Sequence, residues 1–243
     1  MGLLVAYGLA RSRERTGPAA TAIAAVMPAA AILAWGAIPQ PVAPLGGPDC
    51  ANPASPLVAW RVLEAAVGLA MVTLLVIDRR AAWSELGLRL GSRRNALVAM
   101  LAFLVLAPVA LYAGGIIGVT GVAESFFGTY RIDASNPAAF VPAVIFAVSN
   151  ALAEELAYRG ALRTWLLPSL GVVGANLAQA TVFGLAHTGQ DFVGPVVPTA
   201  VAMLAAGFVA GVIARRTSSL AIVLAVHAAF DIPLFFYWAC RLA

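Results

Sequence analysis

The sequence predicts an all-α protein, a polytopic transmembrane helix bundle of about seven spans. Hydrophobic residues make up 62% of the 243 positions and charged residues only 11%, and the mean hydropathy is +0.91. A soluble domain of this length would carry about 25% charged residues, so most of this surface must face lipid. The apolar stretches are about 20 residues long, which suits helices that cross a hydrocarbon core and not barrel strands of about 10 residues.

Seven stretches are long and apolar enough to form these helices. The first is uncharged, the second carries Arg61 and Glu64 one turn apart near its start, and the fourth and fifth are joined by a turn near Ser169. In chain order the predicted spans are 19–38, 57–77, 95–119, 137–167, 170–188, 194–214 and 219–240. We divide the bundle into two N-terminal spans, residues 1–79, and a core, residues 80–243, with no separate soluble domain.

The segments that flank the predicted spans alternate in charge. By the positive-inside rule, the arginine-rich segments and the N-terminus are cytoplasmic. All 15 basic residues are arginines without interleaved aromatic residues, so we expect a lipid bilayer and no nucleic acid as a partner. The arginine-only, alanine-rich composition is typical of GC-rich bacterial genomes and indicates a bacterial plasma membrane. The arginines of the inner segments are Arg11, Arg13, Arg15, Arg79, Arg80, Arg89, Arg93, Arg94, Arg215 and Arg216.

Three predicted spans contain ionisable residues where lipid makes them costly, by about 3 kcal/mol or more per centred charge. Such groups usually face one another or a water-filled cavity. The chain has only two histidines, and both belong to this set. We therefore expect a polar chamber inside the bundle. The set is Glu154, Glu155 and Arg159 in span four, His187 in span five, and His227 and Asp231 in span seven.

Helical spacing predicts which side chains of span four share a face. Asn150, Glu154 and Tyr158 fall at i, i+4 and i+8 on one face. Glu155 and Arg159 form an i, i+4 ion pair on the adjacent stripe. Counting 1.5 Å per residue from the turns at the membrane surface brings the polar groups of the three spans within about two helical turns of one another. The groups can therefore meet near the middle of the membrane.

Carboxylates and two imidazoles around a wet pocket suit the activation of water. A glutamate can take the proton of the water, and a histidine can orient the water or stabilise the oxyanion that forms. Asp231, one turn after His227, could hold that imidazole in one tautomer. The same set could instead bind Zn²⁺ through Glu154, His187 and His227, with an open position for water. Peptide-bond hydrolysis inside the membrane is the reaction class that we favour.

Three short motifs resemble the signature motifs of the CPBP family, which comprises CAAX-prenyl-protease and bacteriocin-processing enzymes, also called ABI or type II CAAX endopeptidase-like proteins. They are Glu154-Glu155-x-x-x-Arg159, Phe183-x-x-x-His187 and His227-x-x-x-Asp231. Tyr158-Arg159-Gly160 and the stretch 85–89 are also similar to the family. Each motif alone is weak, but three in this order on separate spans are specific. The resemblance covers mainly residues 80–235.

The resemblance implies an intramembrane endopeptidase with a protein or peptide substrate. The family is described both as a metalloprotease and as a glutamate-dependent protease, so the resemblance does not decide whether the activity requires Zn²⁺. In one departure, the last motif position is often asparagine in the family and is an aspartate here, which only accepts hydrogen bonds when ionised and favours an orienting or metal-binding role. The resemblance implies that Glu154 activates the attacking water with the help of His187. His227 and Asp231 would line the side of the site where the oxyanion forms, and Glu155 and Arg159 would hold the local geometry.

Two other function classes fit the same buried cluster. A non-catalytic membrane scaffold would retain it for packing, and a proton-coupled transporter would use carboxylates and histidines as a proton relay. A Glu155–Arg159 pair alone could lock helix register, but a register lock does not need the second carboxylate. The sequence has no inverted repeat, which argues against transport.

Overall fold

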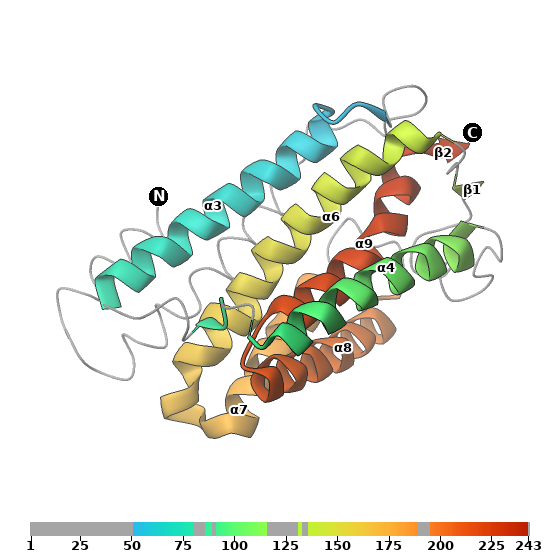
Figure 1. Cartoon of the computed structure of the whole chain (residues 1–243). Helices are drawn as coiled ribbons and strands as arrows, with labels where there is room; N and C mark the ends of the chain where they lie inside the picture. The colour runs from blue at the N-terminus through green and yellow to red at the C-terminus, as the bar shows by residue number, and fades with distance from the viewer. Residues whose placement is uncertain are drawn as a thin grey trace.

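Helices form most of the chain that the structure describes (Figure 1). The computed structural model describes residues 51–79, 86–88, 91–115, 131–132, 136–188 and 195–242. Predicted span one, the arginines at positions 11, 13, 15, 80 and 89, and Glu85 lie outside the described residues. The helices are α3 (Pro56–Arg79), α4 (Arg93–Gly115), η3 (Pro137–Ala139), α6 (Phe140–Glu154), the π-helix η4 (Glu155–Leu162), α7 (Arg163–Ala186), α8 (Val196–Thr217) and α9 (Ala221–Ala239).

Three helical segments among the described residues are long and apolar enough to cross a membrane: Arg93–Ala110, Pro137–Ala186 and Val196–Thr217. Residues Ala221–Phe236 form a shorter apolar helix. The all-helical class is therefore confirmed, whereas the number of seven spans and the division at residue 79 stay predictions. Apolar side chains such as Met100 and Leu104 on α4 are more than half exposed, as expected of a helix that faces lipid.

The long segment Pro137–Ala186 folds back on itself at Gly171. Gly171 has φ +66° and ψ −178°, a conformation that favours glycine and breaks the helical path inside α7. The rings of Tyr158 and Phe183 lie 5.3 Å apart, whereas an unbroken helix would separate these residues by about 37 Å. The predicted turn near Ser169 is thus confirmed in kind, but it lies at the glycine that tolerates positive φ.

A π-helix interrupts the same segment between α6 and α7. It spans Glu155–Leu162, and the backbone N–H of Arg163 bonds the carbonyl of Tyr158, five residues earlier. The sequence predicts regular α-helical spacing here, so this is a difference from expectation. The wider turn changes the direction of every side chain after Glu154, at the place where the ionisable residues are concentrated. Its side chains are buried.

The remaining elements pack around this hairpin. Helix α9 contacts both α4 and α6, α3 packs on α6, and α7 packs on α8 (Figure 1). The buried centre between α6 and α9 includes Phe146, Phe235 and Phe236, none of which is exposed. A pair of two-residue antiparallel strands, β1 (Arg131–Ile132) and β2 (Arg241–Leu242), joins the end of the chain to the segment before α6.

Small residues let α7 and α8 approach closely. A Cβ atom on Gly211 would lie 1.8 Å from Oδ1 of Asn176, and a Cβ atom on Gly184 would lie 2.6 Å from the carbonyl oxygen of Ala200. Gly207 is less restricted, since its Cβ atom would meet Phe183 Cδ1 at 3.1 Å. Close packing through these glycines places α7 against α8 beside the polar cluster.

Candidate active site

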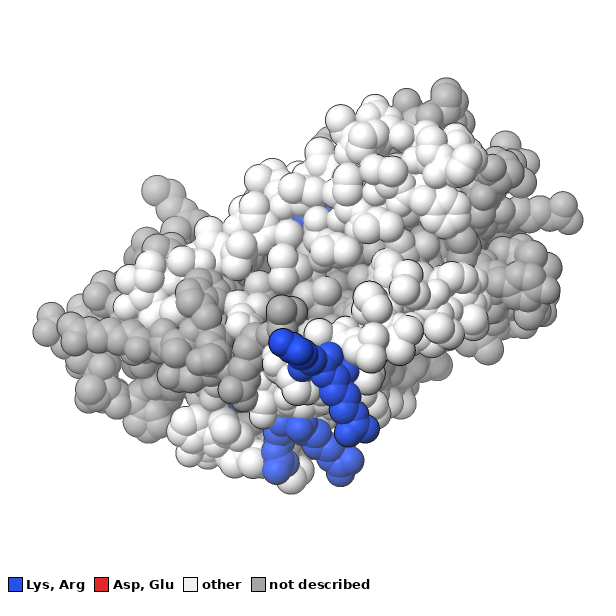
Figure 2. All heavy atoms as spheres, viewed as in Figure 1, with Lys and Arg blue, Asp and Glu red and all other residues white. Residues whose placement is uncertain are grey.

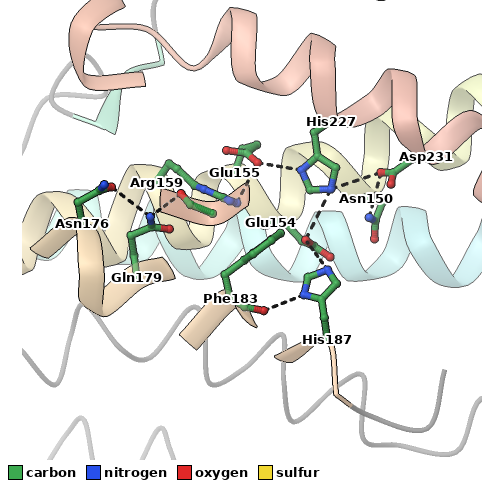
Figure 3. Close-up of polar contacts among 11 residues, drawn as sticks. Asn150, Glu154, Glu155, Arg159, Asn176, Gln179, Phe183, His187, His227 and Asp231 are labelled. Atoms are coloured by element: carbon green, nitrogen blue, oxygen red, sulfur yellow. Dashed lines mark hydrogen bonds and ion pairs between the residues drawn. The ribbon is translucent and has the colours of Figure 1, made fainter. Parts of the chain in front are cut away.

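The structure brings all six predicted residues into one cluster (Figure 3). Glu155, Arg159 and Asp231 are buried, and Glu154 and the two histidines are half-buried. Glu154 ends α6 and lies between the two histidines. Its Oε2 is 3.8 Å from Nε2 of His187 and 3.7 Å from Nε2 of His227. The same oxygen is buried and has no hydrogen-bond partner among the described residues. A buried carboxylate oxygen without a partner carries a desolvation cost, so another group is expected to fill the space beside it.

Each histidine is held through its other ring nitrogen. Nδ1 of His187 lies 2.7 Å from the carbonyl oxygen of Phe183, one turn earlier in α7. Because a carbonyl only accepts hydrogen bonds, Nδ1 of His187 donates. Nδ1 of His227 lies 2.8 Å from Oε1 of Glu155 and donates to that carboxylate. These two Nδ1 hydrogen bonds fix the orientation of the rings, so that Nε2 of each imidazole faces Glu154.

The partner of His227 differs from the expected one. The sequence suggests Asp231 as the residue that fixes this imidazole, but the carboxylate that accepts its hydrogen bond is that of Glu155, 72 positions away in the chain. Oδ2 of Asp231 lies 3.7 Å from Nε2 of His227, too far for a hydrogen bond. Asp231 instead accepts a bond of 3.0 Å from Nδ2 of Asn150. Asp231 is thus held by α6, on the side of His227 that faces Glu154.

The expected pair of Glu155 and Arg159 is present. Nη1 of Arg159 donates to Oε1 of Glu155 at 2.9 Å, and each residue is only 1% exposed. The guanidinium also lies over the ring of Phe183, with Cζ 4.0 Å from the ring centroid. Cation–π contact and ion pairing together compensate for the burial of this charge. Oε1 of Glu155 is shared by Arg159 and His227, so the pair also fixes the histidine.

Two polar residues that the sequence reading does not single out support the cluster from α7. Nε2 of Gln179 donates to the carbonyl of Gly207 at 2.8 Å and to Oδ1 of Asn176 at 3.1 Å (Figure 3). Nδ2 of Asn176 donates to the carbonyl of Phe208 at 3.0 Å. These bonds join α7 to α8 and fix the helix that carries His187. The only sequence signal was their polar character, one turn apart, inside an apolar span.

A second buried ion pair lies on α3. Nη1 of Arg61 bonds Oε2 of Glu64 at 2.6 Å, and the guanidinium lies 5.7 Å from the ring centroid of Phe146 on α6. The sequence shows this pair at the start of its span without assigning it to the site. The contact with Phe146 places the pair on the flank of the helix that presents Asn150 and Glu154. We regard it as a support of α6 and not as a member of the cluster.

The predicted zinc ligands face one another without forming a metal site. Neighbouring ligands of a tetrahedral Zn²⁺ lie about 3.3 Å apart, so the separations of 3.7 and 3.8 Å would have to shrink by about 0.4–0.5 Å. Within the described parts of the chain, no group of three or more His, Cys, Asp or Glu side chains is arranged to hold a metal ion. The donor types nevertheless suit zinc, and the orphaned oxygen of Glu154 points to their common space.

Comparison with known families gives one match. Residues 136–233 match the family model described as Type II CAAX prenyl endopeptidase Rce1-like. Neither the curated proteins nor the solved structures gave a match. The matched stretch runs from the residue before η3 into α9 and contains the whole polar cluster. Residues 136–233 are therefore similar to the Rce1-like family of type II CAAX prenyl endopeptidases, a family of peptidases.

Proposed function

We propose that this protein is an intramembrane endopeptidase in which Glu154 activates a water molecule. One observation carries the proposal: Oε2 of Glu154 is buried without a hydrogen-bond partner among the described residues, between Nε2 atoms of His187 and His227 at 3.8 and 3.7 Å. When His187 is neutral and donates from Nδ1, its Nε2 atom and the Glu154 carboxylate are two acceptors that face one space. A water molecule has the two protons that such a space requires.

The cluster supplies the parts of a hydrolysis reaction. In the first step Glu154 takes a proton from the water while the water oxygen forms a bond to the carbonyl carbon of the peptide. The imidazole of His187, fixed by the Phe183 carbonyl, orients the water. His227, when it is protonated on both ring nitrogens, donates from Nδ1 to Glu155 and from Nε2 to the oxyanion, and it keeps both protons through the step. Glu154 then gives its proton to the amine nitrogen as the carbon–nitrogen bond breaks, which leaves the carboxylate ready for another cycle.

The other residues of the cluster position these groups. Glu155 and Arg159 hold His227, since one carboxylate oxygen contacts both. Asn150 holds Asp231 beside the same histidine. Misplacement of a reacting group by about 1 Å can reduce a rate by about a hundredfold. These three buried contacts therefore act on the rate through position and not through contact with the substrate.

Glu154, His187 and His227 are also the residues that would hold a zinc ion. Bound zinc would polarise the peptide carbonyl and lower the pKa of its water. The contacts of Phe183 and Glu155 with the Nδ1 atoms would serve this arrangement equally, because they leave Nε2 of each imidazole available. A chelator thus separates two versions of one proposal.

The test is peptide cleavage by the detergent-purified full chain, with a mixed peptide library that includes prenylated peptides. Wild type is compared with Glu154→Ala, His187→Ala and His227→Ala, each with and without a zinc chelator. Ser149→Ala, five residues before the cluster's first glutamate in the same helix, is the control. We expect cleavage by wild type and the control and a loss of at least about a hundredfold in the three variants.

Three outcomes would contradict the proposal. Full activity of Glu154→Ala would show that Glu154 does not activate the water. A scaffold would show no cleavage in wild type and reduced thermal stability in all three variants, and a transporter would show proton flux in liposomes that depends on the same residues.

A further inference from the structure

A cavity of about 380 Å³ lies between the first half of α7 and the end of α8. None of the residues that line it belongs to the polar cluster, and no aspartate or glutamate is among them. Two arginines, Arg163 and Arg215, supply its charge, and apolar side chains such as Leu167, Val173 and Val212 supply its walls. A cavity of this size with a few polar groups in apolar walls is typical of a small-molecule site.

The cavity lies at a strongly basic end of the bundle. Arg93 and Arg94 begin α4, Arg215 and Arg216 end α8, and all four are exposed. A bond of 3.3 Å from Nδ2 of Asn95 to the carbonyl of Thr217 joins these two helix ends. Figure 2 shows the basic side chains gathered there, with no acidic side chain of the described residues on the same face. The local potential therefore favours an anion.

The two arginines of the cavity come from different helices, Arg163 from α7 and Arg215 from α8. Arg163 is half-buried, and its Nη1 donates to the carbonyl of Gly211 at 2.8 Å. A guanidinium has five N–H donors, so this anchoring bond leaves capacity for a ligand. Arg215 is exposed at the rim. Planar guanidinium groups match the oxygen geometry of a phosphate, which makes arginine a preferred phosphate ligand.

The open side of the cavity is apolar. Leu167 is 41% exposed and Val173 is 69% exposed, next to the turn at Gly171. An apolar wall offers no favourable contact to a free phosphate ion, whereas the acyl chains of a lipid can pack against it. The predicted topology puts this end of the bundle at the inner leaflet, where anionic headgroups attract arginines.

We propose that this cavity binds an anionic phospholipid. The phosphate lies between Arg163 and Arg215, and the first carbons of the acyl chains lie along Leu167 and Val173. The site is distinct from that of the proposed hydrolysis, because Glu154, His187 and His227 are not among the residues that line it. Lipid would then hold α7 to α8 at the end opposite His187.

The experiment titrates the full chain, in mixed micelles, with phosphatidylglycerol or phosphatidylcholine and reads bound lipid by native mass spectrometry. The matched variants are Arg215→Gln and Arg216→Gln, neighbouring exposed arginines of which only the first lines the cavity. Glycerol 3-phosphate and inorganic phosphate are added as competitors. The readout does not depend on cleavage, so it succeeds or fails independently of the proposed activity.

We expect phosphatidylglycerol to bind at least about fivefold more tightly than phosphatidylcholine. Arg215→Gln should weaken that binding about tenfold, as loss of a charge-assisted contact does, and Arg216→Gln no more than about threefold, as a screened surface charge does. Equal losses in the two variants would mean diffuse attraction to the surface and would overturn the proposal. So would equal binding of the two lipids, or displacement of phosphatidylglycerol by phosphate or glycerol 3-phosphate at similar concentrations.

Discussion

The neighbouring glutamates of the cluster should differ sharply in what they do for stability. Glu155 pairs with Arg159 at 2.9 Å and with His227 at 2.8 Å, and it is 1% exposed. Oε2 of Glu154 has no hydrogen-bond partner among the described residues. The change of each carboxylate to an amide, Glu155→Gln or Glu154→Gln, keeps the shape of the side chain and removes its charge. The two variants are therefore matched controls for one another.

The magnitudes follow from these contacts. Breaking a buried ion pair by removing one partner costs about 3–5 kcal/mol, because the other charge is left uncompensated. Glu155→Gln should fall at the lower end, about 3 kcal/mol, since the amide oxygen still accepts hydrogen bonds and the Phe183 ring, 4.0 Å from Cζ of Arg159, still contacts the guanidinium. Glu154→Gln should change the free energy of unfolding by less than about 1 kcal/mol, because Oε2 of Glu154 has no hydrogen bond to lose among the described residues and the desolvation cost of a charge is relieved.

The assay is unfolding of the purified protein in one detergent, by scanning fluorimetry and by titration with denaturing detergent. For a chain of this size, a loss of 3 kcal/mol corresponds to a fall in Tm of about 10 °C. We expect that fall for Glu155→Gln and a Tm near wild type for Glu154→Gln. Equal falls would refute the reasoning, because they would show that Glu154 holds the fold together as Glu155 does.

Further predictions concern the helix packing and the last motif position. Gly211→Ala should lower stability by about 2–3 kcal/mol, because its Cβ atom would lie 1.8 Å from Oδ1 of the buried Asn176; Gly207→Ala, with a nearest contact of 3.1 Å, should cost about 1 kcal/mol in the same unfolding assay. A larger loss in Gly207→Ala would contradict the packing argument. Asp231→Asn should keep the bond from Asn150, since an amide oxygen also accepts, and retain cleavage within about tenfold of wild type; loss of all cleavage would show that a carboxylate is required there.

The residues of the cluster could be predicted because ionisable side chains are rare inside apolar membrane spans. Ionisable side chains are costly inside a membrane, so Glu154, His187 and His227 could be expected to meet, and helical rise showed that their depths agree. The Glu155–Arg159 pair could be predicted as well, because an i, i+4 contact depends only on local geometry. These contacts are confirmed at 3.8 Å or less.

The sequence could not predict that Glu155, and not Asp231, accepts the hydrogen bond from His227. Sequence reasoning favours the residue one turn from His227, and the actual partner lies 72 positions away. The π-helix that begins at Glu155 also has no periodic signal in the sequence. The bonds of Gln179 were also hidden, because their acceptor is the backbone carbonyl of Gly207 on α8, and its position depends on helix packing. Tertiary contacts thus decided what local spacing left open.

The most direct test of the account is the single-turnover rate of peptide cleavage by wild type and by Glu154→Gln, measured on samples whose Tm is recorded in parallel. If Glu154 activates the water, Glu154→Gln keeps the Tm of wild type and loses at least about a hundredfold in rate. If Glu154→Gln cleaves as fast as wild type, or loses its rate only together with its Tm, the glutamate does not carry the chemistry and the central claim is wrong.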